Sequence, residues 1–244
     1  MRTRITRGLS AVLAVSALSL TAACGGSDDT KKDGADKPSA AGSASASAAP
    51  TSQAPAATPL TDAQMKAAAL EVKDLPSGWK TKKAEESTSV YKADKAACQP
   101  LADMMGPDIA GATTGASVDF VIGNNASELS EQVATFPGTG AADYVKKLST
   151  ALDGCAEFTV ESEGQKIKLG ATKITAPQGA EEALALGLSL EVAPGIKIEP
   201  KLVVARQGAG MFRLMHLADA AASKKDFDGI AKVATDKFVK AAQG

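Results

Sequence analysis

The stretch that decides the fold is Ala183-Leu184-Ala185-Leu186-Gly187-Leu188-Ser189-Leu190-Glu191-Val192. Large apolar side chains alternate with small or polar ones, and a period of two is typical of a strand with one buried face. Successive side chains of a strand point to opposite sides, so the leucines share one face. The other face carries Gly187 and Ser189, and we expect that another part of the chain can lie close over it.

Shorter alternating runs lie on both sides of this stretch. Pro194-Gly195 predicts a turn at its end. The runs are residues 118–122, 129–136, 158–160, 167–174, 196–204 and 212–216. Runs of this length, with turn residues between them, indicate strands joined as hairpins.

Four segments have helical patterns. Thr61, followed by Gln64, is a capping-box signature, and residues 74–79 end that helix. The buried face of the first helix is expected to comprise Met65, Ala68, Ala69 and Val72. A second helix is expected after a cap at Asp94, with Pro100 inside it, a third from Thr139 or Gly140 to Leu152, and a fourth from Ser223 or Asp226. The sequence therefore predicts an α+β fold, an antiparallel sheet flanked by helices.

The N-terminus has the features of a bacterial lipoprotein signal. Arg2, Arg4 and Arg7 precede an uncharged apolar segment that ends in Leu20-Thr21-Ala22-Ala23-Cys24. Residues 1–23 are therefore expected to be a signal peptide. Cys24 would receive the lipid and hold the protein on the extracytoplasmic face of the cell membrane. The alternative is a secreted protein that is cut by an ordinary signal peptidase.

Composition separates a tether from a globular domain. Residues 24–60 are rich in Ala, Ser, Gly and Pro and cannot bury enough apolar surface to order themselves. We expect a disordered linker with a root-mean-square span of ~30–36 Å. Residues 61–244 then form a single α+β domain.

Cys98 and Cys155 remain after Cys24 is set aside, and in an oxidising compartment they are expected to form a disulfide; two buried free thiols are the alternative.

The charge excludes one class of partner. The chain has 27 Lys and Arg against 28 Asp and Glu, and removal of the signal-peptide arginines leaves 24 basic residues against 28 acidic ones. This balance gives no electrostatic footprint for nucleic acid. Attachment to the membrane is accordingly expected to come from the lipid.

Few residues could support catalysis. His216 is the only histidine, so no metal site and no cofactor are expected. Ser77 and Lys80 have the spacing of a Ser-x-x-Lys enzyme, but they lie in a turn and the companion motifs are missing. We expect no enzymatic activity.

Four residues are candidate ligand contacts, namely Trp79, Arg206, Arg213 and His216. Each has an ordinary structural interpretation: Trp79 as a cover of the core, His216 as a partly buried side chain with one hydrogen bond. Arg206 and Arg213, on neighbouring strands, could form an anion site or an exposed pair near glutamates.

The Ala67-Ala68-Ala69-Leu70 segment and the following Asp74-Leu75-Pro76-Ser77-Gly78-Trp79, with Cys98 about twenty residues later, resemble the opening of a group of actinobacterial envelope domains. The group includes the extracellular sensor domains of mycobacterial receptor serine/threonine kinases and small lipoproteins. The resemblance spans residues 61–244. It implies an antiparallel sheet flanked by helices and a concave surface for a small ligand.

These observations predict a membrane-anchored envelope lipoprotein whose domain binds a small molecule or a cell-wall component. The alternative is a non-enzymatic accessory module that binds an envelope protein through a strand edge or through the small-residue face near Gly187 and Ser189.

Overall fold

The computed structural model describes residues 57–244, except 85–86, 124–126, 194–195 and 219–222. The expected signal peptide, Cys24 and nearly all of the expected tether lie outside the described residues. Leu60, the last residue of that tether, is buried, and its backbone N–H donates to Thr135 Oγ1 at 2.8 Å.

The strands form one antiparallel sheet within the described residues. They are β1 (Lys80–Lys82), β2 (Lys92–Ala93), β3 (Thr113–Ile122), β4 (Ser127–Thr135), β5 (Glu157–Ser162), β6 (Gln165–Ile174), β7 (Glu182–Ala193), β8 (Ile196–Ile198), β9 (Lys201–Gln207) and β10 (Gly210–Ala218). Their order across the sheet is β1-β3-β4-β10-β9-β7-β6-β5-β2, and β8 pairs with the end of β7. The predicted α+β class is confirmed.

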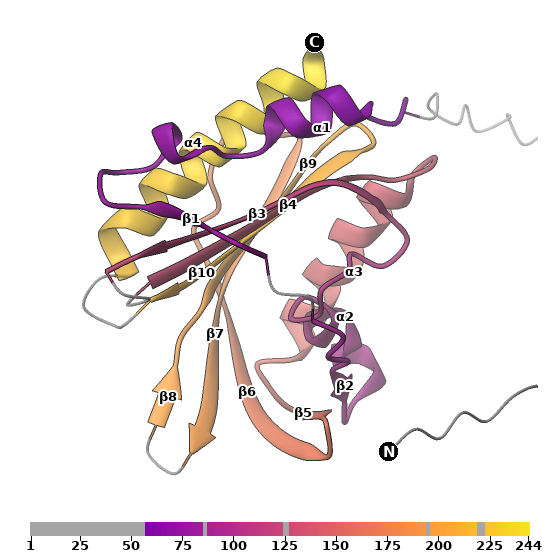
Figure 1. Ribbon diagram of the computed structural model, residues 1–244. Helices are drawn as coiled ribbons and strands as arrows, with labels where there is room; N and C mark the ends of the chain where they lie inside the picture. The colour runs from indigo at the N-terminus through magenta and orange to yellow at the C-terminus, as the bar shows by residue number, and fades with distance from the viewer. Residues whose placement is uncertain (1–56, 85–86, 124–126, 194–195, 219–222) are drawn as a thin grey trace, which may run out of the picture. The chain divides into compact units, whose positions relative to one another are not determined.

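The helices cover both faces of the sheet, which confirms the predicted antiparallel sheet flanked by helices. They are α1 (Asp62–Ala68), α2 (Gln99–Asp103), α3 (Gly140–Gly154) and α4 (Ser223–Gln243), with short 3-10 turns η1 (Val72–Asp74) and η2 (Ala96–Cys98). Figure 1 shows α1 and α4 side by side on one face, and α2 and α3 on the other. Two hydrophobic cores result, one under each helix pair.

The period-two run of β7 contributes to both cores. Leu186 and Leu188 are buried against α3, as expected of the large apolar face. On the opposite face Ala185 is buried in the core under α4. Further along β7, Gly187 and Ser189 remain partly exposed, because α4 covers only part of that face.

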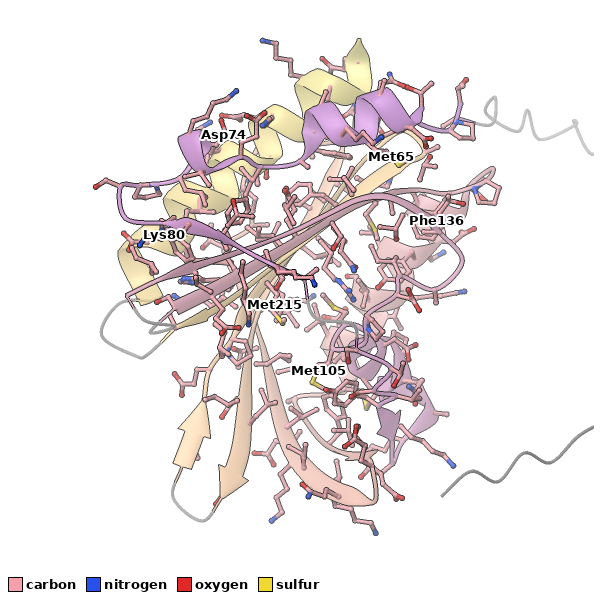
Figure 2. The ribbon with its side chains drawn as sticks, in the orientation of Figure 1. Met65, Asp74, Lys80, Met105, Phe136 and Met215 are labelled. Atoms are coloured by element: carbon pink, nitrogen blue, oxygen red, sulfur yellow. A yellow bond between two sulfur atoms is a disulfide. The ribbon has the colours of Figure 1, made fainter. Side chains whose placement is uncertain are left out.

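The predicted N-terminal cap of the first helix is confirmed, whereas its predicted buried face is only partly correct. Thr61 Oγ1 accepts from the backbone N–H of Gln64, and the Gln64 side chain accepts in turn from the N–H of Thr61, which completes the capping box. Met65 projects from α1 toward the sheet (Figure 2) and is buried. Val72, however, lies beyond the end of α1 and is 41% exposed, so its expected place in the buried face is wrong.

Two other local predictions are corrected. Asp94 does not cap the second helix: its carboxylate accepts from the backbone N–H of Thr159 and so extends the pairing of β2 with β5. The helix itself begins at Gln99, with Pro100 in its first turn, where proline lacks only a hydrogen bond that the turn does not need. The expected single strand over 196–204 is divided into β8 and β9 near Pro200.

The disulfide between Cys98 and Cys155 is present, with Cα atoms 5.7 Å apart. It joins the end of η2 to the residue after α3, and both cysteines are buried. Among the described residues, no helix has the length and apolar character needed to cross a membrane.

Candidate functional site

A hollow of about 880 Å³ lies over the half of the sheet that α1 and α4 leave uncovered. Its lining comes from β5, β6, β7, β8 and the segment after β2, and includes Asp94, Lys95, Ala156, Glu157, Thr159, Lys168, Gly170, Thr172, Ser189, Glu191 and Lys197. The leucines of β7 point to the other face of the sheet, so mainly small and polar side chains face this hollow.

The floor of the hollow is low because its central position has no side chain. Gly170 on β6 pairs with Glu157 on β5 and with Ser189 on β7. Thr172, two residues along, donates from its hydroxyl to the carbonyl of Gly187 at 3.4 Å. The floor therefore offers the hydroxyl groups of Thr172 and Ser189 beside backbone without side chains.

A row of alternating charges crosses the sheet next to this floor. Lys168 on β6 lies opposite Glu191 on β7, and Glu191 lies opposite Lys197 on β8. At the β5 side, Lys95 donates to the carbonyl of Glu157 at 3.2 Å. Charges of both signs around hydroxyl groups suit a small polar molecule that carries donors, acceptors and charge of its own.

Trp79 and His216 lie outside this hollow, in the core under α1 and α4. Their ring centroids are 6.0 Å apart, and His216 stacks on Phe227 at 5.9 Å. The Trp79 indole covers the core, as the structural interpretation of this residue predicted. His216 is only 2% exposed, and neither of its ring nitrogens has a hydrogen-bond partner among the described residues. Burial lowers the pKa of His216, and the nearby Lys201 adds to this effect. The expected single hydrogen bond is therefore wrong.

Glu131 on β4 is a further polar group in the same core, and no sequence signal singled it out. It is 1% exposed, and its Oε2 accepts from the backbone N–H of Leu70 at 2.6 Å, while Oε1 has no partner among the described residues. Burial raises the pKa of Glu131 to about 8. The carboxyl is therefore protonated at neutral pH.

The two arginines do not come together as an anion site. Arg206 pairs with Glu181 and with Glu182. The expected alternative, an exposed pair of arginines near glutamates, is nevertheless wrong, because the Arg206 side chain is mostly buried and Arg213 contacts no glutamate. Arg213 is buried, and burial lowers its pKa. Its guanidinium donates to the carbonyls of Met104, Gly106 and Pro107 and to Gln132 Oε1. Arg213 thus fastens the segment after α2 to the sheet.

The described residues do not form a Ser-x-x-Lys site or a metal site. Ser77 lies in a turn at Gly78, whose φ is +102°, and Lys80 begins β1, so the helical geometry of a Ser-x-x-Lys site is missing. The described residues contain no group of three or more His, Cys, Asp or Glu side chains that could hold a metal ion.

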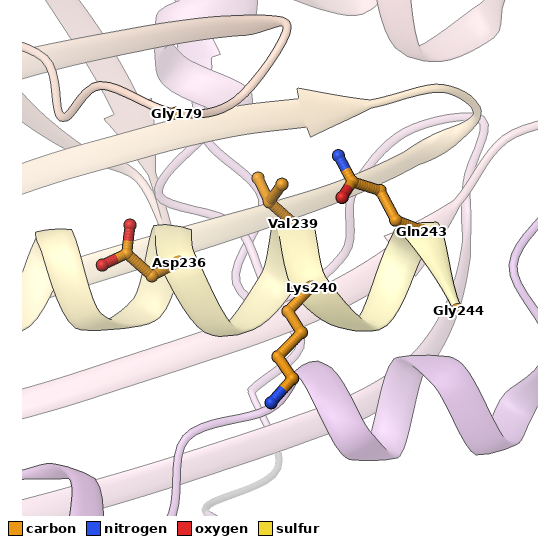
Figure 3. Close-up of a pocket in the computed structure, with 6 residues that line it drawn as sticks. All are labelled: Gly179, Asp236, Val239, Lys240, Gln243 and Gly244. Carbon is orange, nitrogen blue, oxygen red and sulfur yellow. The ribbon is translucent and has the colours of Figure 1, made fainter.

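A second, smaller depression of about 390 Å³ lies between the end of α4 and the segment at Gly179 (Figure 3). In this view Asp236, Val239 and Gln243 point to the side of Gly179, and Lys240 points away from it. The carboxylate of Asp236 is already paired with Lys232. This depression therefore offers less chemistry than the hollow on the sheet.

Comparison with known proteins identifies the fold. The structure is similar to the extracellular domain of PknH from Mycobacterium tuberculosis, at 15% sequence identity and a TM-score of 0.56, over 75% of this chain and 98% of that one. It is more distantly similar to an Rv0999 ortholog from Mycobacterium smegmatis, at 10% identity and a TM-score of 0.40, over 78% and 99% of the two chains. No protein-family model and no curated protein matches the chain. The chain therefore shares its fold with the extracellular domain of PknH.

Sequence reasoning found part of the hollow. The small-residue face at Gly187 and Ser189 follows directly from the period-two run, and Ser189 lines the hollow while Gly187 adjoins its floor. Lys168 and Thr159 carried no signal, because their place in the hollow depends on the register between β5, β6 and β7.

Proposed function

We propose that this protein is an envelope lipoprotein, anchored outside the cell through Cys24, whose domain binds a small polar molecule or a cell-envelope component in the hollow over β5, β6 and β7. The observation that carries the proposal is the floor at Gly170 and Ser189, where small residues and hydroxyl groups leave room next to a row of alternating charges. The sequence resemblance to sensor domains and the shared fold with the extracellular domain of PknH support an extracytoplasmic, sensor-like role.

The test is a thermal-shift screen of the full chain against envelope metabolites and lipid-free cell-wall fragments. A molecule that binds the folded state alone raises the melting temperature, by an amount that grows with its concentration. Ser189→Trp should abolish the shift, because the indole would occupy the floor of the hollow.

Ala67→Trp, at an exposed position of α1 outside the hollow, is the matched control. It adds the same indole elsewhere and should keep both the fold and the binding. A shift that is unchanged in Ser189→Trp would place the ligand elsewhere and contradict the proposed site.

A second candidate function is a protein-interaction module that uses the same uncovered face. The observation in its favour is that Gly187 and Ser189 leave this part of the sheet accessible to another backbone. Absence of any thermal shift, together with an envelope protein whose crosslinking to the chain is lost in Ser189→Trp, would favour this module over the small-molecule receptor.

A further inference from the structure

A third surface feature is a groove of about 560 Å³ between α3 and the segment formed by η2 and the start of α2. Its lining comprises Ala96, Ala97, Pro100, Asp143, Lys146, Lys147, Thr150, Ala151, Gly154 and Cys155. The groove and the hollow over the sheet have no lining residue in common.

The floor of this groove is apolar and made of short side chains. Ala96 and Ala97 are exposed although they are apolar, and Pro100 is half-buried beside them. Ala151 and Cys155 close the bottom from the side of α3. The apolar floor consequently remains in contact with water.

The length of the groove is set by α3. Its lining residues run from Asp143 to Gly154 on one side of the helix, and at 1.5 Å per residue they extend over about 16 Å. The hydrocarbon layer of one membrane leaflet is about 15 Å thick, half of the bilayer core. The groove thus has the length of one acyl chain. A Cβ at Gly154 would meet nothing within 4 Å, so the groove is open at this end.

The rim of the groove is positively charged. Lys146 and Lys147 are both exposed, and neither side chain forms a hydrogen bond or an ion pair with a described residue. Asp143, the one acidic residue of the lining, accepts a hydrogen bond from the Thr139 hydroxyl at 2.9 Å. Two lysines without partners next to an apolar floor are complementary to an anionic head group joined to an acyl chain.

We infer that this groove binds the acyl chain of an anionic lipid, with the chain along Ala96, Ala97 and Ala151 and the head group at Lys146 and Lys147. This goes beyond the proposed function, because it assigns a separate site with a separate class of ligand. Either proposal can therefore fail alone.

The test uses cis-parinarate, a fluorescent long-chain carboxylate, titrated into the full chain carrying Cys24→Ser. That substitution removes the expected acylation site, so that no lipid of the protein itself competes for the groove. Ala97→Trp should reduce the affinity by at least tenfold, because the indole would fill the floor from an exposed position. Ala67→Trp, at an exposed position of α1, is the matched control and should bind as the parent does.

A double variant tests whether the charges of Lys146 and Lys147 hold the head group. Lys146→Gln with Lys147→Gln should weaken binding of cis-parinarate about tenfold and leave binding of its uncharged methyl ester unchanged. The inference is overturned if the parent does not bind cis-parinarate, or if neither Ala97→Trp nor the double lysine variant weakens binding. It is also overturned if a peptide copying residues 39–57 occupies the groove and cis-parinarate does not displace it.

Discussion

The carboxyl of Glu131 should make the stability of this domain depend strongly on pH. Its pKa is about 8 in the folded protein and 4.5 in its ordinary state. Because the folded form holds the proton more tightly, folding stability is greatest below pH 4.5 and falls as the pH rises toward 8. At about 1.4 kcal/mol per pH unit, the loss reaches about 3 kcal/mol at pH 7 and about 5 kcal/mol once the carboxyl is ionised.

Glu131→Gln removes this titration and keeps an oxygen to accept from the Leu70 N–H. Urea titrations at pH 5 and pH 8 measure the effect. Between these two pH values, the free energy of unfolding of the parent should fall by about 4 kcal/mol more than that of the variant. The depressed pKa of His216 acts in the opposite direction, but it is common to both proteins and cancels in the comparison.

Glu128→Gln is the matched control, since Glu128 lies on the same strand, is only partly buried and pairs with Lys82 at 3.2 Å. Its unfolding free energy should follow the parent across the same pH range. Equal pH dependence of the Glu131→Gln variant and the parent would contradict a raised pKa, because Glu131 would then be ionised in the folded protein.

Three further perturbations follow from contacts in the structure. Replacement of Cys98 and Cys155 by alanine should lower the free energy of unfolding by about 4 kcal/mol, since the bridge closes a loop of 57 residues, and a urea titration should show it. Gly115→Ala should cost about 1–3 kcal/mol, because its Cβ would come within 2.2 Å of Met65 Cε; addition of Met65→Ala should restore part of the loss in a double-mutant cycle. Arg213→Met should cost about 3 kcal/mol and accelerate amide exchange in residues 104–106, because the carbonyls of Met104 and Gly106 would lose their donor; unchanged exchange there would contradict this role.

Much of the fold could be predicted from the sequence, because it depends on local patterns. The capping box at Thr61, the alternation in β7 and the apolar stripe of α4 each follow from a short stretch of residues. The sequence did not predict which helices cover which face of the sheet, because this depends on packing between segments that are distant in the sequence. Asp94 shows the same limit, because its carboxylate accepts from the backbone N–H of Thr159 on the neighbouring strand and not from a helix terminus.

The candidate sites show where sequence reasoning stops. Trp79, His216 and the two arginines were conspicuous as rare residue types, but their side chains are committed to the core or to carboxylates and carbonyls of the protein. The hollow is built from common residues such as Gly170 and Thr172, and only the strand register brings them together on one face. The rare residue types thus lie outside the hollow, which is lined by small residues on an uncovered face.

The most direct test of the proposed receptor role is amide chemical-shift mapping of the full chain during titration with envelope metabolites. We expect shifts concentrated at Thr159, Gly170, Thr172 and Ser189, and we expect them to be lost in Ser189→Trp. Shifts confined to any other surface, or the same shifts in Ser189→Trp, would contradict it.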